Sequence, residues 1–181
     1  MMMEKKQYGW WMGVALCGVA LLGFGCSEDE DDASTDDTAT QLSGTVDATG
    51  LALQGMSGTA LEGVELTVAA GALPEGVEVT VVSVDFATVP PLPEQGVSVG
   101  PLVEVQVSDS SAQGNFSLKL PFDQATVAAN GQDSIQVKVW HRPPDGWALL
   151  EPTSLESSFV EIESQSFASL FGAGIDVAPA E

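Results

Sequence analysis

His141 is the only histidine of this 181-residue chain and the residue best suited to acid–base chemistry. Asp145 follows four positions later and serines are numerous, so the residue types of a hydrolytic triad are present. Asp145 is itself the aspartate of a Pro-Pro-Asp-Gly stretch, however, and aspartate is favoured there for turn hydrogen bonding. The Gly-x-Ser-x-Gly spacing occurs at residues 96–100, but it lies in a run of alternating valines that indicates a strand, and a nucleophile elbow needs a sharp strand-to-helix turn. We therefore expect no catalytic residues, with a hydrolase that uses His141 and a nearby serine as the alternative.

Residue types for a metal or cofactor are also sparse. A zinc cluster needs several Cys or His ligands at fixed spacing, and the histidine and the cysteines lie at opposite ends of the chain. The acidic run after Cys26 lacks the ligand spacing and turn glycine of a calcium loop. We expect neither metal nor cofactor. Trp147 is either a stacking platform for a ligand or, as we expect, a core anchor that starts the next strand.

The charge balance restricts the partners. The chain has 26 acidic and five basic side chains, a net charge of -21. Such a surface repels phosphate backbones, so nucleic-acid binding is not expected, and it disfavours adsorption to anionic lipid headgroups. The same repulsion predicts a soluble domain that is monomeric.

The first residues have the pattern of an export signal. Lys5 and Lys6 are followed by an uncharged, mostly apolar stretch, and the small residues Gly23 and Gly25 precede Cys26. A retained membrane helix is the alternative, since the stretch approaches the ~20 residues that a span needs. The flank that follows it is acidic, not basic.

Cys26 is the residue that separates these interpretations. If the chain is cut after Gly25, Cys17 leaves with the signal and Cys26 becomes a lone cysteine at the mature N-terminus, where no internal disulfide can form. This junction resembles the bacterial lipoprotein signal, although Gly23 stands where that signal usually has leucine. The resemblance implies acylation of Cys26, including palmitate, and, because Ser27 follows, sorting to the outer membrane. Plain secretion remains the other possibility.

The composition divides the chain into four parts. Residues 1–25 are expected to form a signal peptide and residues 26–42 a tether, which the lipoprotein resemblance implies is lipidated at Cys26. The tether is rich in Asp and Glu and has no large apolar residue before Leu42, so it is expected to be disordered. A domain over residues 43–177 and a short tail, 178–181, complete the chain.

The domain shows short runs of alternating apolar and polar residues separated by Gly, Pro, Asn and Asp. Period-two alternation indicates strands with one buried face. The sequence therefore predicts an all-β fold, a single antiparallel β-sandwich. The expected inward-facing residues are Val64, Leu66, Val68, Val77, Val79, Val81, Val97, Val99, Val103, Val105, Val107, Phe116, Leu118, Leu120, Phe122, Ile135, Val137, Val139, Val160 and Ile162.

Three local features refine this prediction. The alternation changes phase after Val81, which suggests a bulge in that strand. Residues 123–130 suit one or two helical turns capped by Asp123. Gly71 is expected to have a positive φ or a close neighbour that a β-carbon would crowd.

Several segments resemble the ZU5 family. They are "VAAGAL" at 68–73, "FSLKLPFDQA" at 116–125, "VKVWHRPPDGWALLEPTSLE" at 137–156 and "FASLFGAG" at 167–174. The resemblance implies a β-sandwich that serves as a scaffold or surface module, without a general catalytic activity.

Some members of that family cleave their own chain at a Phe-Ser step near the end of the domain. That chemistry needs a serine hydroxyl and a base. In one alignment Ala168 occupies the nucleophile position. In the other Ser169 is present, but Phe167 stands where the family often has histidine. We therefore expect no self-cleavage.

These observations predict a non-catalytic, lipid-anchored envelope lipoprotein that presents a β-sandwich for protein binding, adhesion or envelope architecture. The partner is expected to be an envelope or extracellular protein. The alternative is an envelope hydrolase or self-processing domain.

Overall fold

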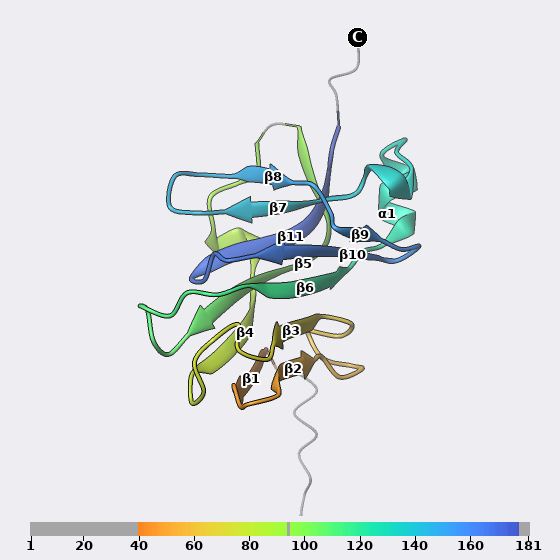
Figure 1. The fold of residues 1–181 in the computed structure, drawn as a ribbon. Coiled ribbons are helices and arrows are strands. Elements are labelled where there is room, and N and C mark those ends of the chain that lie inside the picture. The colour runs from red at the N-terminus through yellow and green to blue at the C-terminus, as the bar shows by residue number, and fades with distance from the viewer. Residues whose placement is uncertain (1–39, 94, 178–181) are drawn as a thin grey trace, which may run out of the picture. The chain divides into compact units, whose positions relative to one another are not determined.

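A computed structural model describes residues 40–93 and 95–177 as an all-β domain (Figure 1). Two antiparallel sheets face each other with the hydrophobic core between them, which confirms the predicted β-sandwich. The six-stranded sheet has the order β1-β4-β5-β11-β7-β8, and the five-stranded sheet has the order β2-β3-β6-β10-β9. No helix in the described part of the chain is long and apolar enough to cross a membrane.

The elements follow one another with short connections, and the first strand begins two residues before the expected start of the domain. The strands are β1 (Gln41–Thr45), β2 (Gly50–Gln54), β3 (Glu65–Ala69), β4 (Glu78–Val84), β5 (Gly96–Val107), β6 (Phe116–Pro121), β7 (Lys138–Arg142), β8 (Ala148–Leu150), β9 (Ser154–Leu155), β10 (Phe159–Ser164) and β11 (Ser169–Asp176). The helical elements are η1 (Phe86–Thr88), α1 (Gln124–Ala129) and η2 (Ser134–Gln136).

The period-two pattern is confirmed most clearly in the strands that face the middle of the core. In β6, Phe116, Leu118 and Leu120 are buried while the residues between them are partly exposed. Val160 and Ile162 of β10 behave in the same way. Alternation predicts these strands well because one face packs on the opposite sheet and the other meets solvent.

The predicted bulge in β4 is wrong. The pairing of β4 with β5 runs without interruption from Val79 to Val84, so the second set of valines simply points to the outer face of the sheet. The irregularity lies in β5 instead, where Gly172 pairs with Leu102 but Gly174 pairs with Ser98. The extra β5 residues include Pro101, which has no N–H to give to the ladder.

The outer face of the six-stranded sheet is also covered near its middle. Trp140, Leu102 and Leu170 are buried there, apart from the main core. The covering segment, residues 85–93, lies over them. A β-carbon on Gly96 would come within 2.9 Å of Leu92 and 3.0 Å of Trp140. As a result, β11 is buried on both of its faces.

Trp140 leaves no room for a side chain at its neighbour on β11. A β-carbon on Gly174 would lie 2.2 Å from Cδ1 of Trp140, closer than any real contact. Gly172, two residues earlier on the same face, is less confined, because the nearest atom to such a carbon would be the flexible Cδ1 of Leu102 at 3.3 Å.

Of the remaining local predictions, those for Asp123 and Gly71 are confirmed and the one for Ile135 is wrong. Asp123 caps α1 by accepting a hydrogen bond from Ala125 N at 2.9 Å, as predicted. Gly71 has φ +73°, and a β-carbon there would meet nothing within 4 Å, so its conformation and not its surroundings requires glycine. Ile135 is not an inward-facing strand residue. It lies in η2 and is 78% exposed.

Candidate functional site

The predicted lipidation site cannot be placed in the fold. Cys26 lies outside the described residues, as do the predicted signal peptide, the tether up to residue 39 and the tail at 178–181. The geometry available for a site is therefore that of the sandwich itself.

The pairing of β7 with β11 places the only histidine inside the sandwich. His141 lies directly opposite Phe171 in the ladder and is 7% exposed. The orientation follows from alternation, since Val137 and Val139 also point inward. The histidine thus occupies a position at which the pattern would place an apolar residue.

A chain of phenylalanine rings begins at one face of this histidine. Its imidazole stacks on Phe171 with ring centroids 4.7 Å apart and an interplanar angle of 14°. Phe171 in turn meets the edge of Phe116 from the opposite sheet at 5.8 Å, and Phe116 lies 4.9 Å from Phe167. The stack therefore connects the two sheets through the core.

Burial decides the protonation state of this histidine. Desolvation lowers the pKa of His141 below its ordinary value, because the cationic form loses its hydration. Its Nε2 is buried and has no hydrogen-bond partner among the described residues. At neutral pH the ring is uncharged, and placing a proton on it inside the core is unfavourable.

Ser169 is the serine on the same inward face of β11 as Phe171. It is 3% exposed, and its hydroxyl donates to the carbonyl oxygen of Phe167 at 3.4 Å. Ala168, just before it, has φ +53° and is the one described non-glycine residue with a positive φ. Its N–H donates to Val105 O at 2.7 Å, which helps to hold this unfavourable conformation.

These residues do not assemble into a triad in the structure. Within the described residues, no hydrogen bond joins Nε2 of His141 to Ser169. Asp145 lies exposed in the turn after β7, where Gly146 N donates to Pro143 O at 3.1 Å. Among residues 40–93 and 95–177, the hydroxyl of Ser169 therefore has no hydrogen bond to a base.

The role expected for Trp147 belongs to a different tryptophan. Trp147 is not a core anchor. It is half-buried before β8, and its Nε1 donates to Pro90 O at 3.0 Å, which ties it to the covering segment. The anchor is Trp140, 5% exposed, whose Nε1 is buried without a described partner. The sequence pattern gives no local signal for the burial of Trp140, because alternation with Val139 and His141 points it to the outer face of the sheet.

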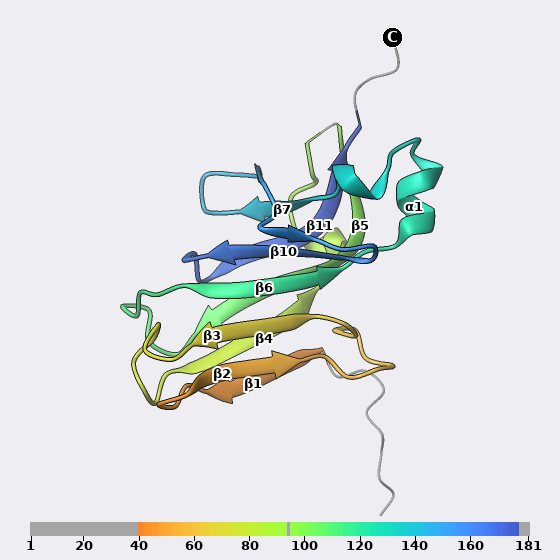
Figure 2. The same ribbon diagram turned by 45° about the vertical axis from the view of Figure 1, so that its right-hand side comes forward.

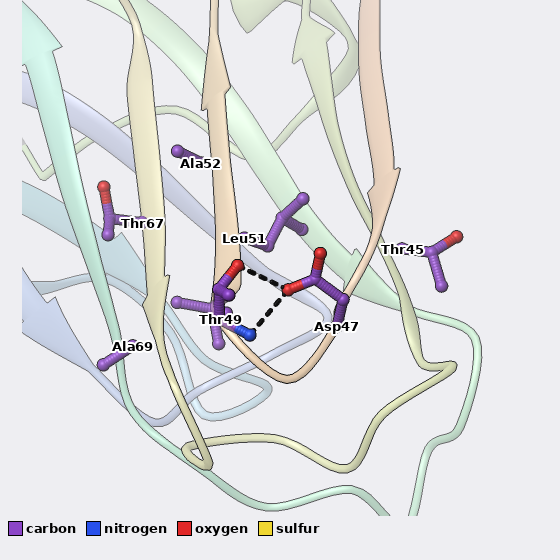
Figure 3. A pocket seen from close by; sticks show the side chains of 9 residues that line it. Thr45, Asp47, Thr49, Leu51, Ala52, Thr67 and Ala69 are labelled. Atoms are coloured by element: carbon purple, nitrogen blue, oxygen red, sulfur yellow. Dashed lines mark hydrogen bonds between the residues drawn. The ribbon is translucent and has the colours of Figure 1, made fainter.

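A hollow that is open to solvent lies at the turn between β1 and β2 (Figure 3). It encloses about 360 Å³ and is lined by small residues such as Ala52, Thr67 and Ala69. Asp47 accepts hydrogen bonds from both N and Oγ1 of Thr49 at 2.7 Å, and the hydroxyl bond lowers the pKa of this carboxyl. The aspartate is thus engaged within its own turn.

Other ligand chemistry has no assembled site in the part of the chain that the structure describes. No group of three or more His, Cys, Asp or Glu side chains gathers there to hold a metal ion. Glu161 lies on the outer face of β10, where it accepts a hydrogen bond from Ser117. In comparisons with known proteins, no family model and no curated protein matches the chain.

The buried histidine predicts a pH-dependent stability. An unfolded histidine has a pKa of about 6.5, and the folded value is lower, so the unfolded chain binds the proton first as the pH falls. Stability should therefore be full above pH ~6.5 and fall below it, toward the folded pKa. Urea unfolding at several pH values between about 7.5 and 5.5 measures this loss.

His141→Phe is the matched variant, because it keeps a ring against Phe171 but cannot titrate. Its stability should change less than that of the parent across the same range, since both proteins share every carboxylate. Equal pH dependence in the two proteins would contradict the assignment to His141.

Proposed function

We propose that this chain is a non-catalytic lipoprotein of the bacterial cell envelope. It is anchored through Cys26 and presents a ZU5-like β-sandwich to an envelope or extracellular protein. The observation that supports the anchor is the junction itself, where an uncharged run ends in Gly25 and Cys26 and is followed at once by an acidic stretch. The proposal places the protein at the outer membrane, because Ser27 follows the cysteine.

The charge of the domain supports an anchor made of lipid chains. Residues 40–177 carry 17 acidic and three basic side chains. Lys119 is paired with Glu156 at 3.5 Å, and Lys138 with Glu151 at 2.5 Å. A surface of this kind gains nothing from anionic headgroups, so stable attachment needs two or more acyl chains.

The site geometry supports a non-catalytic role and also favours one specific alternative. In a self-processing reaction, the Ser169 hydroxyl would attack the carbonyl carbon of Ala168, forming an ester as the peptide C–N bond breaks, and a base would carry the hydroxyl proton to the released nitrogen. Water would then hydrolyse the ester and separate the two fragments. The positive φ of Ala168 favours this alternative, because strain at the scissile bond helps to break it. Against it, Nε2 of His141 has no hydrogen bond to that hydroxyl.

The anchor is tested by feeding bacteria that express the chain with a clickable palmitate analogue. Cys26→Ser should abolish labelling and remove the protein from the outer-membrane fraction. Cys17→Ser is the matched control, because the proposal places this cysteine in the discarded signal, and it should label like the parent. Undiminished labelling of Cys26→Ser would contradict the anchor.

The absence of self-cleavage is tested by the intact mass of purified protein after long incubation. The mature chain should persist undivided. A stable pair of fragments separated between residues 166 and 170 would contradict the proposal if Ser169→Ala abolished it and Ser166→Ala did not.

A further inference from the structure

The first two strands form one side of the sandwich. β1 is an edge of the six-stranded sheet and β2 is an edge of the five-stranded sheet. They follow each other through a tight turn, in which Asp47 and Gly50 exchange backbone hydrogen bonds of 3.2 and 3.0 Å. Both views show the two strands side by side at the same end of the fold (Figures 1 and 2). No described strand pairs with the outer edge of either one.

These edges lack the features that usually protect an edge strand. β1 reads QLSGT and β2 reads GLALQ, so neither contains a charge, a proline or a bulge. The opposite edges are different: β8 has three residues and β9 has two, with Glu151 and Pro152 between them. A five-residue uncharged edge is a template for pairing with another strand.

Apolar side chains follow the inner side of these edges. Leu51 and Leu53 lie directly over Gly44 of β1, where a β-carbon would come within 2.8 and 3.0 Å of them. Together with Leu42 they pack against the main core, yet all three stay half-buried at this open side. An added strand would bury the remaining surface of these leucines.

We propose that β2 pairs antiparallel with β2 of a second copy of this chain, with Ala52 on the two-fold axis. In this register Leu51 of one copy lies opposite Leu53 of the other, on the inner face, and Gly50 lies opposite Gln54. The strand is thus complementary to itself, as an interface between two identical chains with two-fold symmetry requires. The two five-stranded sheets join into one.

The charge distribution favours a second copy on this side. The domain carries 17 acidic side chains against three basic ones, so most faces of two copies repel each other. β1 and β2 contain none of these acids. Asp47, next to them, is engaged by Thr49. Pairing along β2 therefore places no charged side chain of one strand opposite another, and the proposed dimer departs from the monomer expected from net charge alone.

The dimer does not depend on the lipid anchor, so the two proposals fail separately. Cross-linking tests the register in the full chain. Cα atoms opposite each other in an antiparallel pair are about 4.5–5.5 Å apart, within the span of a disulfide. Ala52→Cys should therefore form a linked dimer on mild oxidation, with the peptide joined at position 52 identified by mass spectrometry.

Thr67→Cys is the matched control. Thr67 is also exposed and lies beside Ala52 in the sheet, but one strand further from the axis. It should not form the corresponding link, and the parent chain gives the background from native cysteines. Equal linking at both positions, or none at position 52, overturns the proposal.

The molar mass of the full chain in a mild non-ionic detergent, measured by light scattering over a concentration series, tests the association itself. The parent should approach a protein mass of two copies. Ala52→Lys places like charges on the axis and should weaken dimerisation about fivefold. Thr67→Lys adds the same charge and should not. A monomeric parent, open-ended oligomers or equal effects of the two lysines overturn the proposal.

Discussion

Strand β11 has to fit between two packed layers, and the rest of the fold is arranged around that requirement. Residues Ser169–Ile175 are all buried. On the inner face, Phe171 meets Phe116 of the opposite sheet. On the outer face, Trp140 lies so close that residue 174 has to be a glycine. Because an ordinary sandwich strand is exposed on one side, the covering segment and the Trp140 layer are what distinguish this domain from a bare two-sheet packing.

The same register determines what the inner face offers chemically. It brings His141 onto Phe171 and places the Ser169 hydroxyl on the same side of the strand. Burial keeps the imidazole neutral, but no hydrogen bond joins its Nε2 to that hydroxyl, and the nearby Asp145 stays in an exposed turn. In the proposed function this arrangement is part of the core, and the surfaces that meet partners lie elsewhere; the dimer that we infer uses β2.

Sequence patterns predicted the parts of the fold that depend on local alternation. Phe116, Leu118 and Leu120 follow the pattern because only one face of β6 is buried. The pattern failed in two places. Val82 and Val84 change phase because they face the other side of the sheet, and not because of a bulge. Ile135 continues the period of Val137 and Val139 but lies in η2. The inward direction of His141 could be predicted from its phase. The positive φ of Ala168 and the burial of Trp140 under a distant loop have no such local signal.

The most direct test of this account compares two glycine substitutions on the outer face of β11. Gly174→Ala should lower the free energy of unfolding by about 1–3 kcal/mol, because its β-carbon would clash with Trp140 and with the carbonyl oxygen of Val97. Gly172→Ala should cost clearly less, since only the flexible end of Leu102 has to move. Urea unfolding followed by tryptophan fluorescence measures both. A Gly174→Ala protein as stable as the parent would contradict the confinement of β11 between two layers. An equal cost of Gly172→Ala would contradict the specific crowding at residue 174.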